Sequence, residues 1–202
     1  GDIRVAWTRI AAAVLSAVTF AALYILLNYT QIGRAMRAVS QNRDAALMVG
    51  MQPRKIGRNA VILAASLCGL AGVHLAQRAL DLAQDYAGVR EQFGKPIAGH
   101  QLVQQLLADI ETAVVTSRLL CYQALETLDR GERSNGISAM AKRYATTACE
   151  KAINLAMHVH GGMGIATETG LERMLRDCRM LQVPDATNEI LTLIQGRELT
   201  GV

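Results

Sequence analysis

The longest uncharged stretch of the chain lies near its N-terminus. Residues 10–27, IAAAVLSAVTFAALYILL, hold no charged side chain. About 18 apolar residues is close to the shortest helix that crosses the hydrocarbon core of a bilayer. Trp7 and Tyr24 lie near the ends of this stretch, where interfacial aromatic rings are common. The pattern predicts a helix, which either contacts a membrane through residues 10–27 or is buried in a protein core.

A basic segment follows the apolar stretch. Between residues 28 and 59 the only acidic residue is Asp44, whereas six cations are present: Arg34, Arg37, Arg43, Arg54, Lys55 and Arg58. Lys and Arg concentrate on the cytoplasmic side of membrane spans. We therefore predict that residues 1–59 form an apolar helix, transmembrane in the membrane interpretation, and a basic loop that faces the cytoplasm.

The remainder of the chain has helical periodicity. Apolar side chains recur there at three- and four-residue intervals, and polar side chains occupy the opposite face. The predicted helices span residues 60–86, 101–129, 137–160 and 188–199. A polar loop at 130–135 and the Gly161-Gly162 pair separate them, since paired glycines readily end a helix. The predicted fold class is all-α, with an antiparallel four-helix bundle in residues 60–202.

Composition narrows the function classes. Hydrophobic residues make up 51% of the chain, aromatic residues only 4%, and Ala and Leu dominate, which favours closely packed helices. The net charge of +4 includes no basic run interleaved with aromatic side chains, so we expect no nucleic-acid binding. The four cysteines, Cys68, Cys121, Cys149 and Cys178, form no CxxC pair, which is typical of reduced thiols in a cytosolic protein.

Four sequence blocks carry a resemblance to a known family. They are REQFGKPI at 90–97, Gln101, HGGMG at 160–164 and DATNEI at 185–190. Together, from about residue 70 to residue 202, they resemble the C-terminal helical domain of the acyl-CoA dehydrogenases. The resemblance implies FAD-dependent α,β-dehydrogenation of an acyl-CoA thioester by a homo-oligomer. It also implies an electron-transfer flavoprotein as partner and a cytoplasmic location for this domain.

Arg90 and Gln101 are the first candidate cofactor contacts. The resemblance implies that both contact FAD bound mainly to a neighbouring subunit. A guanidinium fixed between a helix end and a turn suits a pyrophosphate, because its planar fork donates two parallel hydrogen bonds. The alternative for Arg90 is a solvated charge that compensates the dipole at the end of its helix.

The glycine-rich block at 158–162 is the second candidate contact. His158, Val159, His160, Gly161 and Gly162 match the family's flavin-binding turn, in which glycines let the backbone approach a nucleotide. The family usually has Gln where this chain has His158. Two histidines also suggest a metal, but side chains at i and i+2 diverge on a helix and no other ligand cluster exists. We expect no metal site.

Asp185 matches the position of the catalytic base. Many family members carry Glu there, which removes the α-proton of the thioester while hydride leaves the β-carbon for the flavin. Asp is one methylene shorter, so its reach must differ. The alternative is that Asp185 only caps the last helix. Thr187, Asn188 and Glu189 match the flavin-contacting stretch that follows the base.

Parts of the family pattern have no match in this chain. Some members carry the base on the first bundle helix, where this chain reads Ala64-Ala65-Ser66. The family also places a helical domain and a β-domain before the bundle, and together they complete the flavin and acyl-CoA pocket. No match to them precedes the bundle here, so we expect the chain to be inactive by itself.

Residues 1 to about 60 carry a second resemblance. The run from Tyr24 to Gly57, with Asp44-Ala45-Ala46, Gly50 and Ile56, resembles the permease subunit of a branched-chain amino-acid ABC transporter and its loop toward the ATPase. Under that resemblance residues 60–76 would be another span, whereas the uninterrupted helical pattern favours a buried helix. The alternatives are therefore a permease fragment, which would be membrane-associated, or a chimeric fusion joined near residues 58–70.

Overall fold

The computed structural model describes residues 7–48, 52–132 and 134–201, and these residues form an all-α chain with one short hairpin. The chain divides into two compact units, Gly1–Asn59 and Ala60–Val202. We call them the N-terminal unit and the C-terminal helical unit. Gly50, which belongs to the permease-like motif, and Arg133, in the predicted polar loop, lie outside the described residues.

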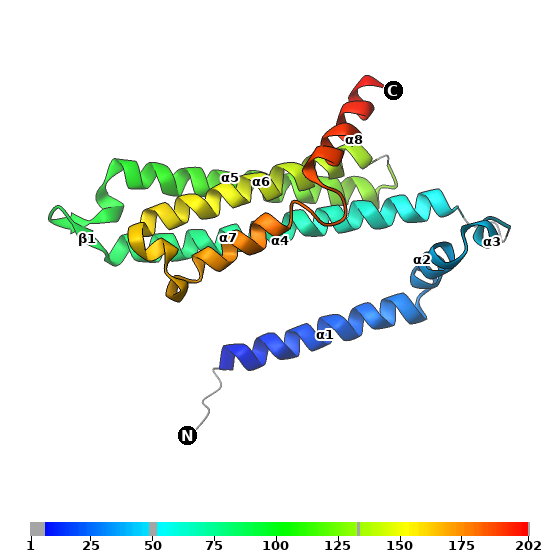
Figure 1. Ribbon diagram of the computed structural model, residues 1–202, viewed down its shortest axis with the longest axis horizontal. Coiled ribbons are helices and arrows are strands. Elements are labelled where there is room, and N and C mark those ends of the chain that lie inside the picture. Colours follow the sequence, from blue (N-terminus) through cyan, green and yellow to red (C-terminus); the bar gives the residue numbers. More distant parts are fainter. Residues whose placement is uncertain (1–6, 49–51, 133, 202) are drawn as a thin grey trace. The chain divides into compact units, whose positions relative to one another are not determined.

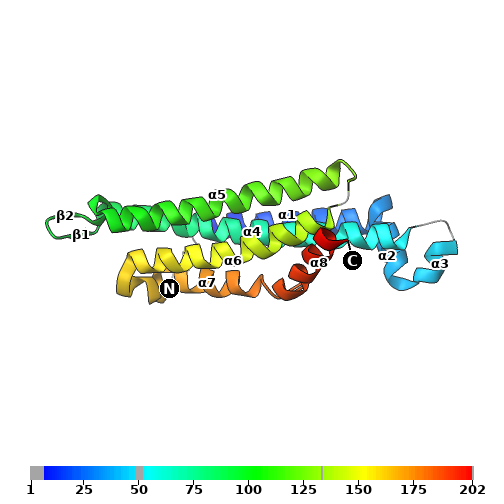
Figure 2. The same cartoon turned by 90° about the horizontal axis from the view of Figure 1, so that it is seen from above.

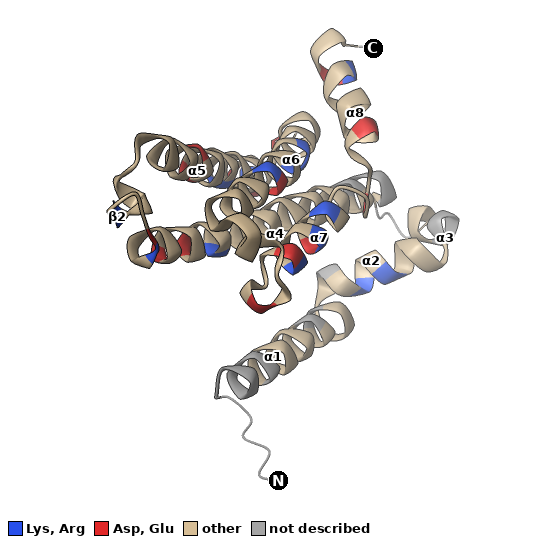
Figure 3. Ribbon diagram, turned by 60° about the vertical axis from the view of Figure 1, so that its left-hand side comes forward, with Lys and Arg blue, Asp and Glu red and all other residues tan. Residues whose placement is uncertain are grey.

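The described residues of the N-terminal unit hold α1 (Trp7–Tyr29), α2 (Gln31–Gln41), α3 (Arg43–Met48) and the start of the next helix at Pro53. The basic segment that was predicted as a loop is therefore largely helical, and that prediction is wrong. Thr30 caps α2, because its hydroxyl accepts a hydrogen bond from the Gly33 N–H at 3.1 Å. Arg37 reaches back from α2 and donates to Asn28 through Nη1 at 2.6 Å. These local contacts set the corner between α1 and α2. Helix α1 includes one charged residue, Arg9, whereas α2 carries two arginines (Figure 3).

Among the described residues, one helical stretch, Asn59–Val89, has the length and hydropathy to cross a membrane by itself. The pair Val14–Tyr29 and Gly33–Gln41, which is bent by 67°, reaches that length and hydropathy only when its two helices are taken together as one span. Within Asn59–Val89, 39% of the apolar window is buried inside the structure. A core helix of a soluble protein has the same composition, so hydropathy alone does not separate the two environments.

Helices α4 (Pro53–Val89), α5 (Gln101–Asp129) and α6 (Asn135–His160) lie side by side and alternate in direction (Figures 1 and 2). From residue 60 onward α4 contributes Val73 and Leu80 to a core shared with Ile110 of α5 and Ile153 of α6. Alanines fill much of the remaining interior, because their small side chains let the helix backbones approach closely. The helical periodicity of these three segments is confirmed.

Gly69 and Gly72 face the sulfur-rich side of this interior. A Cβ on Gly69 would lie 2.7 Å from the Cys121 Sγ, closer than real side chains pack. A Cβ on Gly72 would lie 3.6 Å from the Cys149 Cβ, an ordinary contact. The approach of α4 to its neighbours therefore requires glycine at 69 and tolerates alanine at 72.

A tight hairpin joins α4 to α5. Strands β1 (Glu91–Gln92) and β2 (Lys95–Pro96) pair antiparallel, with Glu91 opposite Pro96. Phe93 and Gly94 form its two-residue turn with φ of 54° and 79°, the positive values that such a turn needs. The 3-10 helix η1 (Ile97–Gly99) then leads into α5. The turn was predicted, and the two flanking strands were not.

The chain after α6 holds one helix that the sequence pattern did not predict. The 3-10 helices η2 (Gly161–Ile165) and η3 (Thr167–Thr169) follow α6, and then α7 (Leu171–Met180) packs against α6. Helix α8 (Asn188–Thr200) contacts the first part of α6, where Glu198 Oε2 accepts from the Gly136 N–H at 3.0 Å. The body of α8 points away from α7 (Figure 1).

Candidate active site and cofactor-binding end

Two of the predicted blocks meet at one end of the C-terminal helical unit. Arg90 follows the last residue of α4, and its backbone N–H donates to the Tyr86 carbonyl at 2.9 Å. The Tyr86 ring stacks on the His160 ring at the end of α6, with centroids 4.5 Å apart and planes 20° apart. His160 is buried, and its Nδ1 lies 2.9 Å from the Ala156 carbonyl. The stacked pair thus ties the Arg90 end of α4 to the glycine turn.

The glycine turn is packed on one side and open on the other. Gly161 ends α6 with φ of 59° and ψ of −134°, a conformation that an L side chain rarely adopts. A Cβ on Gly161 or Gly162 would meet no atom within 4 Å, whereas a Cβ on Gly164 would collide with the Met157 carbonyl. Gly164 therefore seats the turn on α6, and the first two glycines leave their backbone open to a nucleotide.

The residues predicted to contact the cofactor at this end differ in the exposure of their side chains. Arg90, Gln101 and His158 are exposed, so their side chains are free to meet a ligand. Val159 and His160 are buried, and only their backbone groups can serve one. Exposed glycine backbone and an exposed guanidinium at one end of the unit match the chemistry of a pyrophosphate. These residues fit the outer part of FAD.

Asp185 lies on the loop between α7 and α8. Its backbone has φ of 69°, one of two positive values among the described non-glycine residues. Such a conformation is unfavourable for a non-glycine residue unless the surroundings hold it. The N-cap of α8 is Thr187, so Asp185 is not the cap of that helix. The Asp185 side chain is exposed, although partial desolvation raises its pKa and the nearby Lys142 lowers it.

Lys142 of α6 lies under this loop and is fully buried. Its Nζ donates to the Pro184 carbonyl and, at 2.6 Å, to the Ala186 carbonyl. Burial lowers the pKa of Lys142, while the opposing charges of Cys68 and Asp185 raise it. A lysine in an alanine-rich helix is normally solvated, so sequence reasoning did not single out Lys142.

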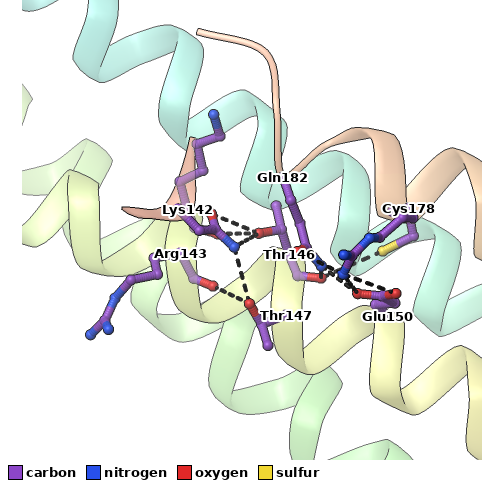
Figure 4. A network of polar contacts seen from close by, with 9 residues as sticks. Lys142, Arg143, Thr146, Thr147, Glu150, Cys178 and Gln182 are labelled. Carbon is purple, nitrogen blue, oxygen red and sulfur yellow. Dashed lines mark hydrogen bonds and ion pairs between the residues drawn. The ribbon is translucent and has the colours of Figure 1, made fainter. Parts of the chain in front are cut away.

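Thr146 and Glu150 continue the stripe of α6 that begins at Lys142, and both bind the segment before α8 (Figure 4). Gln182 donates through Nε2 to the Glu150 carboxylate and, at 3.4 Å, to the Thr146 carbonyl. Arg179 Nη1 lies 3.1 Å from Glu150 Oε2. Spacing by four residues places these three side chains on one face of α6. That polar spacing within alanines is the signal that could have revealed the stripe.

Thr187, Asn188 and Glu189 start α8. Asn188 Nδ2 donates to the Thr147 hydroxyl at 3.1 Å, which fastens the start of α8 to α6. Hydrogen bonds from its own backbone N–H and from Thr187 lower the pKa of the exposed Glu189. The three residues therefore lie beside Asp185, whereas the glycine turn lies at the other end of α6.

The separation between the two groups follows from α6 itself. Lys142, under the Asp185 loop, and His160, at the glycine turn, are 18 residues apart on one helix. That distance is about 27 Å at roughly 1.5 Å per residue. The structure therefore brings Asp185 together with residues 187–189, and Arg90 together with the glycine turn, as two distinct groups.

Comparison with known proteins identifies the family of the chain. The family model described as acyl-CoA dehydrogenase, C-terminal domain, matches residues 54–200, and the chain belongs to the acyl-CoA dehydrogenase family. Residues 3–91 also match the branched-chain amino acid transport system permease component. The two matches overlap on α4. The resemblances drawn from the sequence blocks are thereby confirmed.

Relatives and solved structures agree with the family. The chain is 41% identical to cyclohex-1-ene-1-carbonyl-CoA dehydrogenase of Geobacter metallireducens over 133 residues, 65% of this chain and 35% of the relative. It is 36% identical over 122 residues to the caffeyl-CoA reductase-Etf complex subunit CarC of Acetobacterium woodii, 60% of this chain and 32% of that one. Butyryl-CoA dehydrogenase from Megasphaera elsdenii superposes with a TM-score of 0.65 and 28% identity, over 73% of this chain and 37% of that one. The chain spans about a third of these relatives' length.

Proposed function

We propose that residues 60–202 serve as the C-terminal domain of an FAD-dependent acyl-CoA dehydrogenase, which oxidises the α,β-bond of an acyl-CoA thioester. The observation that carries this proposal is the position of Asp185. It is exposed on a loop whose backbone is fastened to α6 on both sides of it. We interpret the helices of this unit as the antiparallel four-helix bundle of the family.

Asp185 would act as the general base. Its carboxylate would accept the α-proton of the thioester through an Oδ atom, and its raised pKa brings it closer to the working pH of a base. FAD, when bound, supplies the acceptor for the hydride that leaves the β-carbon. Asp in place of Glu shortens the reach, so the loop must carry the carboxylate toward the thioester. Thr187, Asn188 and Glu189 would contact the flavin beside this base.

A second flavin, held mainly by a neighbouring subunit, would contact the other end of the unit. Arg90, Gln101 and residues 158–162 would hold its outer part. The separation of about 27 Å along α6 supports two different flavins, since the base and the turn cannot both serve one reacting centre. This arrangement requires a homo-oligomer. Exposed apolar side chains along α5 support self-association: Leu102, Val115, Leu119 and Tyr122.

One relative supports the electron partner. CarC is named as a subunit of a complex with Etf, which supports an electron-transfer flavoprotein as the acceptor of electrons here. The C-terminal helical unit would then work in the cytoplasm.

The N-terminal unit supports a second candidate function. Residues 1–59 would be a permease-like unit, with the apolar helix α1 in the membrane and the basic segment that forms α2 and α3 in the cytoplasm. The match of residues 3–91 to the permease family and the exposed apolar side chains of α1 favour this assignment. The chain would then be a permease fragment or a chimeric fusion of the two families. The genomic sequence across codons 50–70 distinguishes a natural fusion from a joining artefact.

Fragment complementation tests the dehydrogenase proposal. We expect the chain alone, with FAD and a panel of acyl-CoA thioesters, to give no flavin bleaching and weak FAD retention. Much of the positioning that lowers such a barrier, roughly 7–11 kcal/mol, needs the rest of the pocket. Mixing the chain with the first two thirds of the Geobacter metallireducens relative should restore turnover of that enzyme's own substrate.

The Asp185→Asn variant is the control for this experiment. It keeps the shape of the side chain and removes the base, so turnover should fall roughly a hundredfold to ten-thousandfold. Asp177→Asn, an exposed acid on α7, should leave turnover unchanged. A complemented enzyme that turns over equally well with Asp185→Asn would refute the assignment of the base.

A further inference from the structure

Lys142 makes two bonds that its position in the sequence does not explain. Lys142 is fully buried in α6, and its Nζ donates hydrogen bonds to two backbone carbonyls of the Asp185 loop. These carbonyls belong to Pro184 and Ala186, the two residues that flank Asp185. Burial of an ammonium is unfavourable, so a residue that only filled space would be better as Met or Leu.

The backbone at Asp185 needs such an anchor. A φ of 69° is strained for aspartate and persists only where neighbouring contacts fix it. Lys142 binds one carbonyl before and one after this residue, so it fixes the direction in which the Asp185 side chain leaves the loop. Cys68 of α4 is the other titratable group that interacts with the ammonium, and burial raises the pKa of its thiol.

We infer that Lys142 is the positioning residue of the base: by binding the carbonyls of Pro184 and Ala186, it holds Asp185 in the left-handed conformation from which the carboxylate reaches the substrate. The inference rests on the proposed function for the catalytic part of this role. The role in holding the loop does not depend on it.

Amide hydrogen exchange on the full 202-residue chain tests the loop. Lys142→Met removes both bonds with little change in volume, so the amides of residues 183 and 185–187 should exchange roughly tenfold faster or more. Lys142→Arg keeps the charge and donors and should restore part of the protection. Lys151→Met, an exposed lysine on the same helix, is the matched control and should exchange like the wild type. Unchanged protection of the loop in a folded Lys142→Met chain would overturn the inference.

The wild-type chain decides the question if Lys142→Met does not fold. Nitrogen-detected spectra of the lysine side chains should show Lys142 Nζ protons exchanging with water at least roughly tenfold more slowly than those of Lys151, because two carbonyls hold them. Equal exchange of the two ammonium groups would mean that Lys142 does not bind the loop.

A double-mutant cycle in the complemented enzyme tests the catalytic part. Lys142→Met should lower kcat at least roughly tenfold and leave KM within about twofold, because it misplaces the base without touching the thioester. In the Asp185→Asn background it should have no further effect on kcat. An equal loss in both backgrounds would show a purely structural role. Failure of complementation by the wild-type chain would refute the proposed reaction, whereas the exchange measurements would still decide the role of Lys142 in the loop.

Discussion

The two units of this chain place their apolar side chains in opposite environments. In the N-terminal unit Leu15 is 68% exposed and Phe20 is 74% exposed. In the C-terminal helical unit Ile110 and Ile153 are 0% exposed and lie in one shared core. Both units are helical and rich in Ala and Leu, so composition does not account for the difference.

The difference lies in whether neighbouring helices of the same unit bury the apolar surface of a helix. Burial contributes roughly 25 cal/mol for each Å² of apolar surface removed from water, and the C-terminal helical unit obtains this from its own helices. Helix α1 leaves much of its described apolar surface open, and under the permease proposal a bilayer would cover that surface. The apolar part of α4 is long and hydrophobic enough to span a membrane, yet α5 and α6 bury 39% of its apolar window.

The largest expected effect is on membrane association. The full chain should sediment with membranes or with added vesicles, because the exposed apolar surface of α1 partitions into lipid. Deleting residues 1–58 should release the remainder into the soluble fraction with its helical circular dichroism retained. Recovery of the full chain as a soluble monomer would contradict the proposal that α1 partitions into lipid.

A second effect concerns the thiols of the core. Cys121, Cys149 and Cys178 are fully buried, whereas Cys68 is half-buried. Native-state alkylation followed by peptide mass spectrometry should modify Cys68 first. The three core thiols should react roughly a thousandfold more slowly, through opening of the unit. Equal rates at all four cysteines would show that the core is not closed.

The same thiols make the stability of the C-terminal helical unit sensitive to alkaline pH. Desolvation raises the pKa of Cys121 and Cys178 to about 12 and of Cys149 to about 11. Thiols of the unfolded chain ionise near roughly pH 8.5, so between about pH 9 and 11 the folded state holds more protons and its stability falls as pH rises.

Each thiol should contribute a slope of up to about 1.4 kcal/mol per pH unit, measured by urea unfolding of the 59–202 fragment. Lys142 acts in the opposite direction, because burial lowers its pKa and the unfolded chain then holds the extra proton. Cys178→Ala should remove close to a third of the thiol contribution. If Cys178→Ala left the pH dependence of the free energy of unfolding unchanged, the raised pKa of Cys178 would not be a cause of that dependence.

The smallest expected effect separates two glycines of α4. Gly69→Ala brings a Cβ within 2.7 Å of the buried Cys121 sulfur and should lower the free energy of unfolding by about 1–3 kcal/mol. Gly72→Ala makes only ordinary contacts and should raise it by about 0.5–1 kcal/mol through helix propensity. Urea unfolding of both variants measures the difference, and equal values would mean that the helix approach is not fixed at residue 69.

Sequence patterns predicted most of the fold. Helices α5, α6 and α8 begin and end within about two residues of the predicted bounds. Helices α5 and α6 each have a buried apolar stripe and a polar or glycine stop. Helix α7 was missed, since half of its ten residues are charged and only two of its side chains are fully buried. The β1–β2 strands were missed because two residues are too few to show alternation.

The candidate site was predictable where a residue acts through its own identity. Asp185, Arg90 and the glycine turn could be named from the sequence because carboxylate, guanidinium and glycine have specific chemical uses. The contacts that anchor the Asp185 loop to α6 could not be predicted from the sequence. Lys142 meets partners 42 and 44 residues away, and those partners are backbone carbonyls, which any sequence provides.

The stripe of Lys142, Thr146 and Glu150 therefore has a consequence for transfer of the site between proteins. The Asp185 loop is held by the Lys142 and Glu150 side chains and by the Thr146 carbonyl, three residues of a different helix spaced one turn apart. A loop grafted onto another helical scaffold without them would carry the carboxylate but not its orientation. The smallest portable version of this base consists of the loop together with two turns of α6.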